Sequence, residues 1–205
     1  MLRTMMATTR RVSAVQRYSQ TKLINGESVL EHQGCVAFFC YCIGERLNQY
    51  GEDLNMAELL KGAVIHDLDE VATGDIPRPT KYSNVEVQRA LEDMAYNGVD
   101  ELSSKLRVES LTVQWSDAKE GKEGTIVALS DILSVLYKVW TEVVLYGNRT
   151  IVDHVGPIKE TVDRKIAAVI ATTDNPKSIR FLTGMRSEAS LLHDEIAALG
   201  YKGEY

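Results

Sequence analysis

Apolar residues recur along the chain at intervals of three and four, which is the period of an amphipathic α-helix. The clearest stripe lies in residues 28–50 and consists of Val29, Val36, Phe39, Cys40, Ile43 and Leu47. Ser28 precedes this stripe and Glu31 lies three positions further on, so we expect a capping box to start the helix. A second periodic segment covers residues 54–72, where Asn55 is the expected N-cap.

The rest of the chain predicts further helices and no convincing strand. They are expected in residues 84–106, 122–146, 150–173 and 179–198. The first of these segments fits one or two helices with a break near Asn97-Gly98, and residues 108–121 are the least certain part of the chain. Gly147 should end the helix in residues 122–146, and Asn175-Pro176 should separate the last two. The sequence therefore predicts an all-α fold of about six to eight helices.

Length and composition indicate one globular domain. The chain has 205 residues, of which 44% are hydrophobic and 25% charged, and both fractions are ordinary for a soluble domain. No stretch approaches the roughly 18 apolar residues of a membrane span. The N-terminal segment contains arginines but lacks the apolar region of a secretory signal. We therefore expect one domain over residues 1–205, no membrane partner and a cytoplasmic location.

Charge and cysteine content narrow the possible functions. The chain has 23 basic and 29 acidic residues, a formal net charge of −6. This balance argues against duplex nucleic acid as a partner, because such binding depends on phosphate neutralisation, but it leaves a small phosphorylated ligand possible. The three cysteines, Cys35, Cys40 and Cys42, lack CxxC spacing. We interpret them as small buried residues of a reduced protein.

Two histidines and two aspartates stand out because they occur within apolar helical patterns: His32, His66, Asp67 and Asp131. Burying charged groups without a partner is costly, and a shared divalent ion would compensate all four. Imidazole and carboxylate ligands suit Zn, Mn, Fe, Co or Ni. Hydrogen-bonded core histidines and aspartates paired with Lys or Arg would explain the same residues, so spacing alone leaves a metal site open.

The order His32, His66-Asp67, Asp131 resembles the H…HD…D pattern of HD-domain phosphohydrolases. The segment IHDLDEVATGDIPRPTKY is similar to the central motif of the bacterial 5'-deoxynucleotidase branch, HDxxEVxTGDxPxPxKY. Other segments that resemble this branch are QRYSQTKLINGESVLEH and VALSDILSVLYKVWTEVVLYGN. The resemblance covers about residues 12–150 and implies a single compact HD-domain helical bundle, closed by helices in residues 150–205. It also implies that the two histidines and two aspartates bind the metal.

The resemblance assigns further residues to catalysis and to the substrate. Glu70 is the candidate general acid or base, and Asp75 is the second carboxylate of the pocket. Arg17 matches the arginine that contacts the phosphate in this family. The other expected substrate contacts are Tyr18, Pro77, Arg78 and Lys81. Because Tyr18 replaces a tryptophan associated with packing on the deoxyribose, strictness for deoxyribose stays open.

By this resemblance, the protein is a metal-dependent phosphohydrolase that breaks the bond between the 5'-oxygen and the α-phosphorus of 2'-deoxynucleotides. Cleavage of a dNMP to deoxynucleoside and phosphate, with one divalent transition metal, is the first expectation. A dNTP triphosphohydrolase is the alternative, as in phage enzymes that act on dATP. For that activity Mg also comes into consideration, and Arg78 supplies an extra cation. A non-catalytic nucleotide-binding HD module and a helical interaction protein with a structural metal remain open.

The family also implies a homo-oligomer, a dimer or larger. Apolar positions at Val139, Val143 and Val144 are candidate contacts, although packing within the chain explains them equally well. The remaining two histidines have a plainer interpretation. His193-Asp194 is a second HD dipeptide without the EVxTGDxP continuation, and we interpret it and His154 as surface features.

Overall fold

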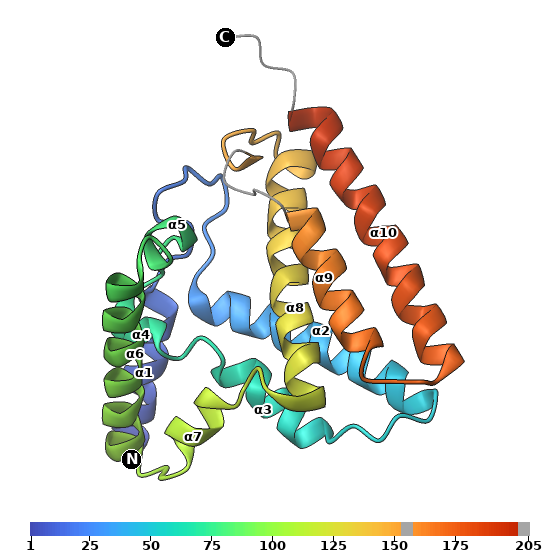
Figure 1. Ribbon diagram of the computed structural model, residues 1–205. Helices are drawn as coiled ribbons and strands as arrows, with labels where there is room; N and C mark the ends of the chain where they lie inside the picture. Colours follow the sequence, from blue (N-terminus) through green and yellow to red (C-terminus); the bar gives the residue numbers. More distant parts are fainter. Residues whose placement is uncertain (153–157, 201–205) are drawn as a thin grey trace.

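The computed structural model describes residues 1–152 and 158–200, with only the backbone of Arg78 (Figure 1). The first elements are α1 (Leu2–Ala14), α2 (Val29–Gln49), α3 (Met56–Ile65), α4 (Glu70–Thr73), α5 (Arg78–Lys81) and α6 (Val85–Leu106). They are followed by α7 (Leu111–Ser116), α8 (Gly121–Trp140), the π-helical turn η1 (Thr141–Leu145), α9 (Ile158–Ile170) and α10 (Pro176–Gly200). In these ranges the only extended pairing is an isolated bridge between Gln16 and Ser28, so the all-α prediction is confirmed.

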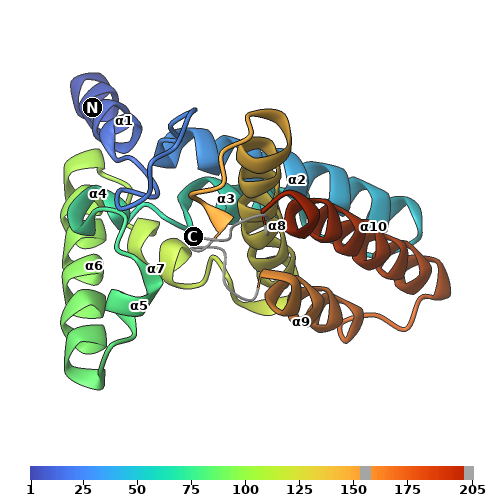
Figure 2. The ribbon, with the colours of Figure 1, turned by 90° about the horizontal axis from the view of Figure 1, so that it is seen from above.

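Two groups of helices, each with its own apolar core, make up the molecule (Figure 2). The larger core joins α2, α3, α8, α9 and α10. The smaller core joins α1, α4, α6 and α7 with the first turn of α2. The polypeptide between α3 and α4 passes from one group to the other and carries His66 and Asp67. Over the described parts of the chain, no helix is both long and apolar enough to cross a membrane.

Helix α2 begins as the sequence predicts. The Ser28 hydroxyl accepts a hydrogen bond from the Glu31 backbone amide, and the Glu31 carboxylate accepts one from the Ser28 amide.

Helix α10 begins earlier than predicted. Pro176 is its first residue, and the Asn175 side chain accepts a hydrogen bond from the amide of Lys177. The predicted start at residue 179 is therefore too late, because proline suits the first helical position, where no amide bond is lost.

The prediction of one continuous helix over residues 54–72 is wrong in its second half. Helix α3 ends at Ile65, and the next residues form tight turns whose amides bond three residues back, from Leu68 to Ile65 and from Glu70 to Asp67. Helix α4 begins only at Glu70. In a continuous helix the side chains of two adjacent residues diverge by about 100°. The turn lets His66 and Asp67 point to one place instead.

The predicted break near Asn97-Gly98 is also wrong, because α6 runs unbroken through both residues. A Cβ atom added at Gly98 would lie 2.3 Å from the Cβ of Ala72 in α4. This glycine therefore allows the short helix α4 to pack closely against α6. Gly147, in contrast, has a φ of +69° and ends the helical segment as expected.

Two other differences have simple causes. Helix α1 was not expected, and its only buried residue is Val12, so its apolar pattern is weak. Of the three cysteines, only Cys40 is buried, whereas Cys42 is exposed, so their interpretation as buried residues is wrong in part. The interpretation of His154 lies outside the described residues.

Candidate active site

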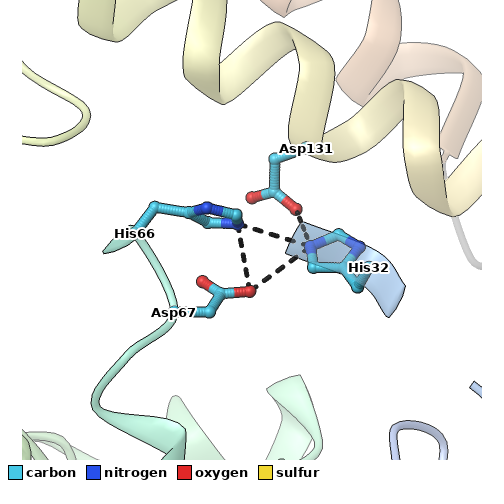
Figure 3. A group of neighbouring side chains, drawn as sticks. All are labelled: His32, His66, Asp67 and Asp131. Carbon is cyan, nitrogen blue, oxygen red and sulfur yellow. Dashed lines mark hydrogen bonds and ion pairs between the residues drawn. The ribbon is translucent and has the colours of Figure 1, made fainter. Parts of the chain in front are cut away.

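Four side chains from three parts of the chain meet at the junction of the two helix groups (Figure 3). His32 comes from α2, Asp131 from α8, and His66 and Asp67 from the turn after α3. One ligand atom from each residue lies within 4.8 Å of every other. The Nε2 atoms of the two histidines are 3.4 Å apart, and Oδ2 of Asp67 lies 3.1 Å from Nε2 of His66. Asp67 Oδ2 and Asp131 Oδ1 each lie 3.3 Å from Nε2 of His32.

Hydrogen bonds to the outer nitrogen hold both imidazole rings. Nδ1 of His66 lies 2.9 Å from the carbonyl oxygen of Ala63, which only accepts, so this nitrogen carries the proton. When Nε2 is unprotonated, as binding to a metal requires, its lone pair points at the other ligands. Nδ1 of His32 lies 2.9 Å from the hydroxyl of Ser134, one turn from Asp131 on α8. Such outer contacts orient metal-binding histidines in known sites.

The cluster has the donor set and the spacing for one divalent ion. Ligand atoms about 2.1 Å from an ion lie about 3 to 3.4 Å from one another, which matches the four pair distances of 3.1–3.4 Å given above. The two histidines are fully or almost fully buried, and the aspartate side chains are 16% and 26% exposed. Two carboxylates also compensate the charge of a divalent ion. These residues could hold such an ion.

A cation that has no signal in the sequence lies beside the aspartates. Nζ of Lys119 is 2.8 Å from Oδ2 of Asp131 and 3.7 Å from Oδ1 of Asp67. Burial alone would raise the pKa of both carboxyl groups. Lys119 and the histidines outweigh this effect and hold the pKa of Asp67 and of Asp131 well below its usual range. Both aspartates are therefore ionised at neutral pH.

Arg17 lies on a loop before α2, where its side chain is 11% exposed and feels the charges of Asp67 and Asp131. Backbone hydrogen bonds from Arg17 to Glu27 and from Val29 to Val15 close the loop and bring its two ends together. The Arg17 Nε and Nη1 atoms are buried without a hydrogen-bond partner, although Nε lies 3.7 Å from the Glu27 carboxylate. Buried donors of this kind are rare unless a ligand satisfies them. Arg17 is thus available to an anion.

Glu70 lies on the other side of the HD turn, in the first position of α4. Its Oε2 atom is buried and has no hydrogen-bond partner. Burial, and then the charge of Asp67, raise the pKa of Glu70 to about 9. The side chain lines a cavity of about 380 Å³, together with Lys81 and Trp115. The predicted substrate residue Lys81 therefore shares a cavity with the predicted acid or base.

Of the remaining predicted residues, Tyr18, Asp75 and Pro77 lie on two loops, and Arg78 is the first residue of α5. The Asp75 carboxylate accepts a hydrogen bond of 2.7 Å from the backbone amide of Tyr18 and so joins the loops. The backbone of Tyr18 has a φ of 57°, which is unusual for a residue other than glycine. The Tyr18 hydroxyl is buried without a hydrogen-bond partner. Pro77 is half-buried in the second loop. The side chain of Arg78 is outside the described structure.

A buried ion pair fixes the loop that carries Arg17. The Glu142 carboxylate is fully buried and accepts from the amides of Ile24 and Asn25, from Asn148 and from Lys138. The Lys138 ammonium also donates to the carbonyl oxygen of Asn25. Lys138 belongs to α8 and Glu142 to η1. Their bonds therefore attach the loop to helices of the larger core.

Replacing Glu142 with glutamine is expected to reduce the free energy of unfolding by about 3 kcal/mol, because it leaves the buried Lys138 without its charged partner. The hydrogen bonds lower the pKa of Glu142 from 4.5 to about 2 despite its burial. The stabilisation is therefore complete above pH 4.5 and is lost as the pH falls towards 2. Urea denaturation between pH 7 and pH 3 should show the two proteins converging at low pH. Glu101→Gln, which removes an exposed pair with Lys105, should change little.

Trp115 also supports the HD turn, although nothing in the sequence marks it for this role. The Trp115 indole donates a hydrogen bond of 3.1 Å to Asp69 within the turn. Trp115 belongs to α7, in the part of the chain with the least certain prediction. The second HD dipeptide is on the surface only in part: Asp194 is 64% exposed and pairs with Lys159, whereas the His193 side chain is 28% exposed and its Nδ1 is buried without a hydrogen-bond partner.

The fold and the four-residue cluster together define an HD-domain protein. An HD-domain phosphohydrolase from Listeria innocua has the same fold, with a TM-score of 0.70 at 20% identity, over 96% of this chain and 98% of its own. The chain belongs to the 5'-deoxynucleotidase YfbR-like family, which matches residues 4–182.

Several relatives carry a 5'-deoxynucleotidase name, among them the following two. The 5'-deoxynucleotidase of Vibrio cholerae is 28% identical over 137 residues, which cover 64% of this chain and 71% of the relative. The 5'-deoxynucleotidase YfbR of Shigella flexneri is 27% identical over 143 residues, which cover 67% and 72%. Both matches extend over more than half of each chain.

Proposed function

We propose that the protein is a metal-dependent phosphohydrolase that converts 2'-deoxynucleoside 5'-monophosphates to deoxynucleosides and phosphate. The observation that carries the proposal is a set of three groups that lie close enough for the charge of Asp67 in the first to act on the other two. These groups are the His/Asp cluster, the unpaired donors of Arg17 and the unpaired buried carboxyl group of Glu70. Membership of the 5'-deoxynucleotidase YfbR-like family supports the same activity.

His32, His66, Asp67 and Asp131 would hold one divalent transition metal, Zn, Co, Mn, Fe or Ni. When bound, such an ion lowers the pKa of coordinated water and polarises the phosphoryl oxygen. The guanidinium group of Arg17 binds the phosphate dianion and neutralises part of its charge. Glu70 holds a proton on its buried carboxyl group and can donate it to the departing 5'-oxygen.

Asp75 and Tyr18 have a joint role in this proposal. The hydrogen bond from the Tyr18 amide to the Asp75 carboxylate fixes the loop that carries Arg17 against the loop after α4. The aromatic ring next to Arg17 is then held where it can pack on the sugar. Pro77 on the same loop, and Arg78 and Lys81 in the short helix α5 that follows it, complete the substrate contacts in this proposal.

Product analysis over a panel of dNMPs and dNTPs tests the proposal. The purified protein is dialysed against a chelator, loaded with each of Zn, Co, Mn, Ni and Mg, and assayed separately for phosphate and for triphosphate release. Phosphate release from dNMPs supports the proposal. Triphosphate release from dNTPs alone would replace it with the triphosphohydrolase activity, and nucleotide binding without turnover would indicate a non-catalytic module.

Replacing Arg17 with alanine is expected to raise the KM for a dNMP about 10- to 150-fold, the equivalent of 1.5–3 kcal/mol for a lost charge-assisted contact. The deoxynucleoside product lacks the phosphate, so its affinity should barely change. Steady-state kinetics and equilibrium dialysis measure the two quantities. Arg10→Ala removes the same charge from an exposed position of α1 and is the control. Unchanged kinetics in Arg17→Ala would exclude Arg17 from the site.

We also propose a cytoplasmic homo-oligomer, in a host cytoplasm if a phage encodes the protein. The expected contact residues Val139 and Val143 are buried within the chain, so they are not available as a surface. A groove of about 670 Å³ between α2, α8 and α10 exposes apolar groups instead, including Phe39 and the half-exposed Tyr137. Light scattering measures the molar mass of the unsubstituted protein and of Tyr137→Glu. Only the unsubstituted protein should have a mass greater than that of one chain.

A further inference from the structure

In each aspartate of the cluster, one carboxylate oxygen lies near the histidines and the other faces Lys119. The inner oxygens, Oδ2 of Asp67 and Oδ1 of Asp131, are those that lie near the histidine Nε2 atoms. The outer oxygens, Oδ1 of Asp67 and Oδ2 of Asp131, face the Lys119 ammonium at 3.7 and 2.8 Å. We propose that Lys119 is a positioning residue that makes each aspartate bind the metal through one oxygen only.

The fold brings the backbone around Lys119 unusually close to both helices that lead into the site. A Cβ atom on Gly124 of α8 would lie 2.3 Å from the carbonyl carbon of Lys119. A Cβ atom on Gly62 of α3 would lie 3.0 Å from the carbonyl oxygen of Ala118. These two glycines allow the segment before α8 to fit between α3 and α8. Lys119 is therefore held in place by backbone packing, although its side chain is 40% exposed.

The positions of these glycines connect the segment to the ligands themselves. Gly62 lies four residues before His66, and its carbonyl accepts the hydrogen bond from the His66 amide. Gly124 lies on α8 two turns before Asp131, on the same face of the helix. Lys119 thus reaches the carboxylates from a segment that packs on both of the helices preceding them.

The charges explain why an ammonium group is suited to this task. Two carboxylates that share one site repel each other and are free to rotate about their last torsion. An ammonium group between the outer oxygens reduces that repulsion and fixes both planes. A carboxylate whose outer oxygen is engaged in this way cannot offer both oxygens to the ion, so positions on the ion stay open for substrate and water.

The inference rests on the metal site of the proposed function, and it can be tested without a nucleotide. The metal-free protein is titrated with Co²⁺, and the visible absorption spectrum and the dissociation constant are measured. Fewer ligand atoms give stronger Co²⁺ absorption, so a change to two-oxygen binding lowers the intensity. For Lys119→Met we expect a weaker spectrum and a 10- to 100-fold weaker affinity, the usual result of removing an outer-shell partner. Lys119→Arg should restore most of both.

Lys122→Met is the matched control, because it removes the same charge from the same segment. Lys122 pairs with Glu52, away from the cluster, so its spectrum and affinity should match those of the unsubstituted protein. A spectrum of Lys119→Met equal to that of the unsubstituted protein, or an equal or tighter affinity, would overturn the inference. Lys119 would then be only a counter-charge that competes with the ion. Failure of the proposed function would appear separately, as normal Co²⁺ binding without nucleotide turnover.

Discussion

Replacing Asp67 with alanine is expected to remove the divalent ion and to reduce turnover by about 10³-fold or more. Several kcal/mol of transition-state stabilisation depend on such an ion, and each 1.36 kcal/mol corresponds to a factor of ten. Asp67 is central to the cluster because one of its oxygens faces both histidines, at 3.3 and 3.1 Å. Metal analysis after dialysis and steady-state turnover measure the two effects.

Thermal unfolding provides a readout that is independent of activity. A ligand that binds only the folded protein raises the melting temperature, so a chelator should lower the Tm of the unsubstituted protein. The Tm of Asp67→Ala should not respond to the chelator. Asp194→Ala changes the aspartate of the second HD dipeptide, which is exposed, and should keep the metal, the activity and the chelator response. Full activity of Asp67→Ala in excess chelator would refute the metal site.

The sequence predicted the residues of the cluster but not how they meet. The HD dipeptide and its TGDIP continuation form a long specific motif, and the apolar stripe of α2 places His32 on its buried side. The turn between α3 and α4 was not predicted, since its residues continue the helical pattern of α3. Its shape depends on tertiary contacts such as the hydrogen bond from Trp115 to Asp69.

The roles of residues that lie outside the recognised motifs and contact the site only in the folded protein could not be predicted. Lys119 reaches Asp131 only because Gly62 and Gly124 let the chain pack closely, and nothing near Lys119 in the sequence marks this. The same holds for Glu142, which fixes a loop more than a hundred residues earlier in the chain, at Ile24. The helix break predicted at Gly98 is the opposite error, since here the sequence indicated a feature that the structure lacks. A glycine that permits close helix packing cannot be distinguished by sequence from one that ends a helix.

Replacing Glu70 with glutamine is expected to reduce turnover by about 10² to 10⁴-fold while metal content and nucleotide affinity are retained. Glu70 does not belong to the group of atoms that could hold the ion, so its substitution leaves the ligands in place. The amide has nearly the same shape as the carboxyl group and still forms hydrogen bonds, but it cannot transfer a proton. The loss should therefore appear in kcat, with KM almost unchanged.

The structure gives Glu70 a position that suits this role. Its amide bonds to the carbonyl oxygen of Asp67, so the side chain starts one turn beyond the ligands. One carboxyl oxygen is buried without a hydrogen-bond partner, and the side chain lines the cavity that contains Lys81. This position is consistent with the proposed donation of a proton to the leaving group, because Glu70 is not among the residues that could hold the ion. Glu86→Gln, an exposed change at the start of α6, is the control.

Three measurements on Glu70→Gln separate the possible roles of this residue. Loss of the metal would make Glu70 a ligand and would contradict its role in proton transfer. Normal turnover would make Asp75 the preferred acid or base, since it is the second carboxylate that the family resemblance assigns to catalysis, although it does not line the cavity beside Glu70. Asp75 already accepts a hydrogen bond from the Tyr18 amide, so its replacement by asparagine should also disturb the loop that carries Arg17 and raise KM. A loss confined to kcat in Glu70→Gln therefore distinguishes proton transfer at Glu70 from positioning by Asp75.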